Sequence, residues 1–190
     1  VMDLGSCCGF FSLQAAAGYP EALVVGVEGS VGIGNGTTGV GGNEDQIIAT
    51  KAVQTHLHWI EKLNLPNCFV TPEVWDYARI CQLAALGRPI SDVMFSLSVV
   101  HHIDNISVQQ YNLARISHLN GTLALIVKLL ELAPRHFIEL PDSPWLEHVY
   151  NAYGTARAFL EAVAKASGRQ WCFVGPLCVS EWYGVREVAV

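Results

Sequence analysis

The sequence is short of basic residues and of long apolar runs. Its 11 Lys and Arg oppose 17 Asp and Glu, which leaves a net charge of −6. Binding to nucleic-acid phosphates usually requires clustered basic side chains, so this balance argues against a broad nucleic-acid surface. Although 51% of the residues are hydrophobic, no uninterrupted apolar run approaches the roughly 18 residues of a membrane span. We therefore expect a globular protein without membrane association.

Metal-type cysteine spacing is also missing. The six cysteines are Cys7, Cys8, Cys68, Cys81, Cys172 and Cys178, and no two of them have C-x-x-C spacing. This usage favours neither a zinc site nor a disulfide framework. It is typical of reduced thiols in an intracellular compartment, so we expect a cytoplasmic protein without bound metal. The sequence does not begin with methionine, and Val1 already lies in a strand pattern, which favours a segment of a longer protein.

Short apolar runs that alternate with amphipathic segments predict an α/β fold. Strands are expected at about residues 1–4, 22–27, 67–70, 92–98, 136–140, 171–178 and 183–190. The segments between the first six have helical periodicity, which indicates parallel strands joined by helices. Only a turn-sized stretch separates the last two strands, so they are expected to pair as an antiparallel hairpin. The predicted architecture is a doubly wound, seven-stranded, mainly parallel sheet with helices on both faces, in one domain of 190 residues.

One segment, residues 121–127, reads as either a strand or the start of a helix. A strand there would leave too few residues to cross over to the strand at 136–140, since a parallel crossover needs about 10 to 12. We therefore expect a helix over about 122–133.

Glycine and capping residues predict where several helices begin or end. Gly18 and Gly154 are expected to end helices, and Asn43 with Gln46 looks like a capping box that starts a helix running to about residue 63. Seven glycines between residues 29 and 42 predict a flexible loop. That loop either has no ligand role of its own or covers a cofactor.

The first nine residues read as a buried strand that runs into a glycine-rich turn and then a helix. A helix N-terminus after a turn of small residues lets the backbone approach a ligand closely. Glu28 ends the next strand, about 20 residues on, where an acid can accept hydrogen bonds from ribose hydroxyls. Asp3, the turn and Glu28 together predict a nucleoside cofactor.

With these elements in place, the chain resembles the class I S-adenosylmethionine-dependent methyltransferases, whose seven-stranded sheet ends in such a hairpin. Residues 1–13 are similar to the family's first motif, although Cys7 stands where the family usually has glycine. Residues 92–103 are similar to the motif at the fourth strand, which ends beside the transferring methyl group. The resemblance implies S-adenosylmethionine as the cofactor. The cofactor-binding residues that it implies are Asp3, Gly5, Ser6, Cys7, Gly9, Glu28, Asp76, Ser96 and Ser98.

Two adjacent histidines, His101 and His102, follow the fourth strand. Methyl transfer from a sulfonium is an in-line displacement that depends mainly on orientation, and a general base is needed only when the acceptor carries a proton. Either histidine is a candidate for that base, and capping or packing is the alternative. Side chains that follow the fifth strand are candidates for an acceptor pocket, with helix capping and packing as the alternative: Glu139, Asp142, Trp145, His148 and Tyr150.

Two other functions remain open. A nicotinamide-dependent oxidoreductase shares the strand, turn and acid, but Cys7 and Phe10 break the G-x-G-x-x-G fingerprint. A non-catalytic binding or scaffolding domain is the second, and Cys7 in the turn favours it. The acceptor is not identified, and the acidic charge slightly favours a small molecule or a protein over nucleic acid. The oligomeric state is left open.

Overall fold

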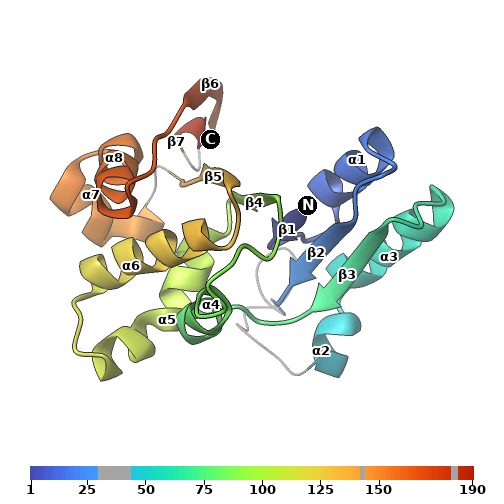
Figure 1. Cartoon of the computed structure of the whole chain (residues 1–190), viewed down its shortest axis with the longest axis horizontal. Coiled ribbons are helices and arrows are strands. Elements are labelled where there is room, and N and C mark those ends of the chain that lie inside the picture. The colour runs from blue at the N-terminus through green and yellow to red at the C-terminus, as the bar shows by residue number, and fades with distance from the viewer. Residues whose placement is uncertain (30–43, 142–143, 181–183) are drawn as a thin grey trace. The chain divides into compact units, whose positions relative to one another are not determined.

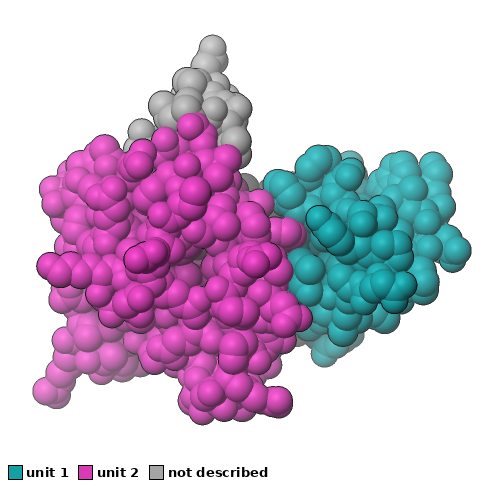
Figure 2. Space-filling view, turned by 45° about the horizontal axis from the view of Figure 1, so that its top comes forward, with its two compact units in different colours: residues 1–75 teal, residues 76–190 magenta. Residues whose placement is uncertain are grey.

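The structure is a computed structural model that describes residues 1–29, 44–141, 144–180 and 184–190. The predicted loop at 29–42 lies outside the described residues, except for Gly29, and so does Asp142. The described residues group into two compact units, 1–75 and 76–190, shown in different colours in Figure 2. The expectation of one domain stays a prediction, and each unit is described by itself.

The first unit is built on three parallel strands. Val25 of the central strand pairs with Met2 on one side and with Phe69 on the other, and its sequence VVGVE is almost wholly buried. Such near-continuous apolar runs are typical of parallel strands covered on both faces. The elements are β1 (Met2–Leu4), α1 (Phe10–Gly18), β2 (Val24–Glu28), α2 (Glu44–Ile48), α3 (Lys51–Lys62) and β3 (Cys68–Pro72) (Figure 1).

The single helix expected from the capping box at Asn43 is wrong, because α2 ends at Ile48 and α3 begins at Lys51. Thr50 adopts an extended conformation and caps α3, with its Oγ1 accepting a hydrogen bond from the Val53 amide at 3.4 Å. The same hydroxyl donates to the Ile47 carbonyl at 2.7 Å. Threonine at this position pairs with an amide that the helix leaves without a partner. The apolar stripe therefore runs over two consecutive helices instead of one.

The second unit contains two parallel strands and a hairpin. Val93 of β4 pairs with Arg135 of β5 in parallel, whereas β7 is antiparallel to both β5 and β6. The strands are β4 (Val93–Leu97), β5 (Arg135–Glu139), β6 (Phe173–Ser180) and β7 (Gly184–Ala189). The helices are α4 (Tyr77–Ala84), α5 (Val100–Leu113), α6 (His118–Glu131), the 3-10 turn η1 (Pro144–Leu146), α7 (Glu147–Tyr153) and α8 (Ala156–Ser167).

The predicted fold class is confirmed. The seven strands have the order β3-β2-β1-β4-β5-β7-β6, and the C-terminal strands are antiparallel (Figure 1). The ambiguous segment 121–127 lies within α6, as the crossover length required. This helix begins earlier than expected because the Ser117 hydroxyl accepts a hydrogen bond from the Asn120 amide at 3.3 Å. Gly18 and Gly154 end α1 and α7 as predicted.

In the described parts of the chain, no helix taken singly has the length and apolar character of a membrane span, and α5 and α6 reach them only as a pair bent by 114°.

Candidate active site

The turn between β1 and α1 is anchored to the end of β2. The amides of Gly5 and Ser6 donate to the Val27 carbonyl at 2.8 and 3.1 Å. The Cys7 amide donates to Oε2 of Glu28 at 2.6 Å. The structure therefore brings Glu28 beside the glycine turn. That the two together hold a cofactor stays a prediction.

Two residues of this turn have left-handed backbone conformations that matter to its shape. Gly9 has φ 86°, which glycine adopts without strain, whereas Cys7 has φ 47°. A non-glycine residue in that region costs on the order of 1 kcal/mol. Cys7 thus takes up a glycine conformation although it carries a side chain. The thiol is half-buried, and burial raises the pKa of Cys7 to about 11, so it stays protonated at neutral pH.

A buried histidine, His56 of α3, lies against the turn. A methyl group built on Gly9 would come within 2.1 Å of the His56 ring carbon Cδ2, and one on Gly26 within 2.8 Å of Cε1. His56 is wholly buried, its Nε2 is 3.9 Å from the Cys68 sulfur, and its Nδ1 has no hydrogen-bond partner among the described residues. Burial lowers the pKa of His56 to about 4. A neutral imidazole therefore fills the space that both glycines leave.

His56 was not among the residues predicted from the sequence. Its position three residues after Val53 and four before Ile60 places it on the apolar stripe of α3. A histidine on such a stripe is the signal that would have indicated a buried ring.

Asp3 is buried, and its carboxylate is hydrogen-bonded to Ser12 of α1. It is only 2% exposed, and its Oδ2 accepts hydrogen bonds from the Ser12 amide at 3.1 Å and the Ser12 hydroxyl at 2.7 Å. Burial raises the pKa of Asp3, the hydrogen bonds from Ser12 partly oppose this shift, and the nearby charge of Glu28 adds to it. Asp3 ties β1 to the first turns of α1, and direct contact with a cofactor stays a prediction.

Asp76, one of the predicted cofactor-binding residues, caps α4. Its Oδ1 accepts a hydrogen bond from the Arg79 amide at 2.8 Å, and its Oδ2 accepts one from the Gln110 side chain at 2.6 Å. The carboxylate thereby joins α4 to α5. In the first unit, the neighbouring Trp75 is buried and donates from Nε1 to Glu73 at 3.0 Å.

The end of β4 supplies two of the predicted residues. Ser96 is fully buried and its Oγ lies 2.9 Å from Nε2 of His136 on β5. Burial, together with the positive charge of Arg169, lowers the pKa of His136 to about 3, so the ring is neutral. Ser98 has φ 56° and turns the chain from β4 toward α5. Ser96 thus links two strands, and Ser98 shapes the strand end.

His101 and His102 lie together at the start of α5. Their ring centroids are 3.9 Å apart, and Trp145 of η1 lies 5.8 and 5.9 Å from them. His101 is buried, whereas His102 is partly exposed. Burial lowers the pKa of His102, which favours the neutral form that can accept a proton. The structure therefore brings both candidate bases and one predicted acceptor-pocket residue into one cluster.

The other residues predicted for the acceptor pocket have contacts that differ from one residue to the next. Glu139 is buried at the end of β5, and the Tyr150 hydroxyl donates to the Pro141 carbonyl at 2.7 Å. His148 lies instead beside Asp104 of α5 and His118 of α6. Asp104 and His118 were not predicted from the sequence, since neither belongs to a local motif.

No family model matches the sequence, and no curated protein does. Among solved structures, the chain is similar to EvdMO1, with a TM-score of 0.58 and 13% identity over 99% of this chain and 35% of that one. This chain therefore spans about a third of the length of EvdMO1. It is also similar to the methyltransferase domain of bacterial CtHen1-CN, with a TM-score of 0.55 and 11% identity over 99% of this chain and 87% of that one. The methyltransferase domain of CtHen1-C gives a TM-score of 0.53 and 13% identity, over 99% and 86%. The chain has the fold of the class I S-adenosylmethionine-dependent methyltransferases.

Proposed function

We propose that this chain binds S-adenosylmethionine and catalyses methyl transfer. The observation that carries the proposal is the Glu28 carboxylate, which lies at the carboxyl end of β2 and accepts the Cys7 amide of the glycine turn at 2.6 Å. A carboxylate has about four acceptor positions, so Glu28 has the capacity to hold the turn and to accept ribose hydroxyls as well. The fold supports this reading by analogy.

The proposed roles of the remaining residues follow from their surroundings. The turn from Gly5 to Gly9 offers closely approachable backbone for the methionine part of the cofactor, because His56 supports it from inside the unit. When bound, the cofactor would supply a methyl group on a sulfonium sulfur, and that sulfur would leave as the neutral thioether of S-adenosylhomocysteine. The chain then has to orient the acceptor, and His102, whose neutral form burial favours, is the proposed proton acceptor.

For the acceptor, we propose a small molecule or a protein. The net charge of −6 supports this choice over a nucleic acid, since phosphate binding relies on basic side chains.

A non-catalytic binding domain is the second candidate, and Cys7 is the observation that favours it. Its side chain stands in a turn where its φ of 47° suits glycine, and a side chain at that position would narrow the space for the methionine part of a cofactor. The two candidates differ in whether the cofactor binds at all.

Calorimetric titration with S-adenosylmethionine, S-adenosylhomocysteine and NADH tests the proposal. We expect both sulfur compounds to bind and NADH not to bind. The Glu28→Gln variant should weaken binding about tenfold or more, because losing hydrogen bonds to a charged acceptor costs about 1.5 to 3 kcal/mol. Glu21→Gln is the matched control, since Glu21 is exposed. Folded protein that binds neither sulfur compound would refute the methyltransferase and favour the non-catalytic domain.

A further inference from the structure

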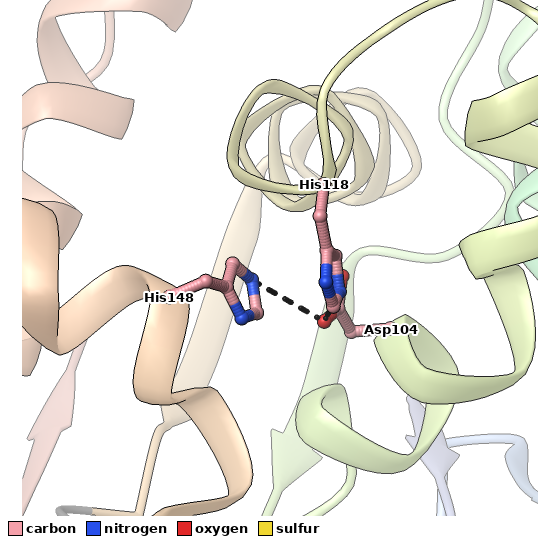
Figure 3. Close-up of side chains that lie close together, drawn as sticks. All are labelled: Asp104, His118 and His148. Carbon is pink, nitrogen blue, oxygen red and sulfur yellow. Dashed lines mark hydrogen bonds and ion pairs between the residues drawn. The ribbon is translucent and has the colours of Figure 1, made fainter.

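Three side chains from three helices of the second unit converge on one point. Asp104 comes from α5, His118 from the start of α6 and His148 from α7. Figure 3 shows both imidazole rings beside the Asp104 carboxylate. One ligand atom from each residue lies within 4.8 Å of the others. The residues are 14 to 44 positions apart in sequence, so only the packing of the helices brings them together.

The two oxygens of Asp104 have different partners. Oδ1 accepts hydrogen bonds from the hydroxyls of Tyr111 at 3.1 Å and Thr122 at 2.7 Å. Oδ2 faces the histidines, 2.7 Å from Nε2 of His118 and 3.6 Å from Nε2 of His148. The side chain of Asp104 is only 2% exposed. Two hydroxyls thus orient a buried carboxylate so that its other oxygen faces two imidazole nitrogens.

The two imidazole rings are stacked. Their centroids are 3.6 Å apart and their planes are within 18° of parallel, a stacking that two positive charges would oppose. Metal ions bind the neutral form of histidine. The Thr122 hydroxyl, 2.8 Å from Nε2 of His148, also links this ring to the carboxylate.

We propose that Asp104, His118 and His148 bind one divalent transition-metal ion. Two imidazoles and one carboxylate are a donor set of zinc sites and of iron(II) sites, and we take zinc as the ion. Around a tetrahedral zinc ion, bonds of about 2.0 to 2.2 Å separate the ligand atoms by about 3.3 Å. The distances of 2.7 and 3.6 Å from Oδ2 to the two nitrogens lie on either side of that value. A fourth position remains for water.

Binding requires a small rearrangement that the site permits. The stacked rings have to tilt apart so that both nitrogens point at one ion, and His118 has to move back from the carboxylate by a few tenths of an ångström. The side chains of His118 and His148 are 38% and 22% exposed, so they have room to turn and the ion has access. Tyr111 and Thr122 hold the carboxylate in place meanwhile, as outer partners of metal ligands commonly do.

The ion would also act on the neighbouring histidine cluster. Asp104 lies one helical turn after His101 on α5, and His148 follows Trp145 by three residues. An ion that joins α5 to α7 therefore fixes Trp145 beside His101 and His102. This inference goes beyond the proposed methyl transfer, because metal binding does not depend on the cofactor.

Metal binding to the chelator-treated full chain tests the proposal. We expect one equivalent of Co²⁺ to produce visible absorption bands, Zn²⁺ to displace it, and Zn²⁺ to raise the midpoint of thermal unfolding. His118→Gln and His148→Gln should each weaken Zn²⁺ binding at least tenfold in calorimetry. His58→Gln is the matched control, because His58 of α3 is an exposed histidine outside the cluster.

Two results would overturn the proposal: wild-type protein that binds neither ion, or Zn²⁺ affinity that is equal in wild type and both cluster variants. Circular dichroism of each variant confirms that it is folded, and the partly exposed His118 provides the milder substitution. S-adenosylhomocysteine binding measured with and without Zn²⁺ keeps failure of this proposal distinguishable from failure of the methyltransferase.

Discussion

The substitution Gly9→Ala tests whether His56 supports the turn between β1 and α1. Two separate costs apply at this position. Gly9 has φ 86°, where a side chain costs about 1 to 2 kcal/mol. The new methyl group would also lie 2.1 Å from the His56 ring, so the ring has to move, and overpacking of this kind costs about 1 to 3 kcal/mol. We expect Gly9→Ala to lower the free energy of unfolding by about 2 to 5 kcal/mol.

Two other glycines separate these costs. Gly87 has φ 66° and open space around its Cα, so Gly87→Ala carries only the backbone cost. Gly18, at the end of α1, has open space and no positive φ, so Gly18→Ala should leave stability unchanged or raise it by up to about 1 kcal/mol. Urea denaturation monitored by circular dichroism gives the three free energies on one scale.

The order of the three variants decides the outcome. Gly9→Ala should be the least stable, Gly87→Ala intermediate and Gly18→Ala the most stable. If Gly9→Ala and Gly87→Ala lose the same free energy, the His56 ring gives way without cost and is not a support for the turn. Combining Gly9→Ala with His56→Ala provides a second check, since the double variant should lose less than the sum of the two single losses.

Two further expectations concern the same unit. The pKa of His56 is 6.5 in the unfolded chain and about 4 in the folded one, so between these pH values the unfolded chain binds more protons. The contribution of the neutral His56 ring to the free energy of unfolding is therefore complete above pH 6.5. About 3 kcal/mol of it is lost as the pH falls to 4. Urea denaturation midpoints between pH 4 and 8 measure this loss of stability. The loss should be smaller in the His56→Gln variant. If that variant loses stability as steeply as the wild type, His56 is not the source of the pH dependence. Ser12→Ala removes a hydroxyl that donates to buried Asp3 at 2.7 Å, so we expect a loss of about 1 to 3 kcal/mol by urea denaturation. The exposed Ala17→Ser serves as a matched surface control, and a loss no larger than in that control would show that Asp3 does not depend on the hydroxyl.

Local patterns were sufficient for the strands and for the C-terminal ends of α1 and α7. Short apolar runs predicted the bounds of all seven strands to within about two residues. The reason is that a buried strand is encoded by a short continuous run of apolar residues. Crossover length decided that 121–127 is helical, and the short final connection predicted the antiparallel hairpin. The break at Thr50 was not predicted, because the apolar stripe continues from α2 into α3 although Thr50 between them is extended and caps α3.

For the candidate site, the sequence determined the turn and the acid at the end of β2, since both belong to one short β-α-β segment with a recognisable order. The structure places the Cys7 amide 2.6 Å from the Glu28 carboxylate, a contact that the sequence did not predict. Only the tertiary structure decided that His56 fills the space behind Gly9, and that Asp104, His118 and His148 meet. These contacts join residues from separate helices. Their side chains meet only once the helices pack, and helix packing leaves no regular spacing in the sequence.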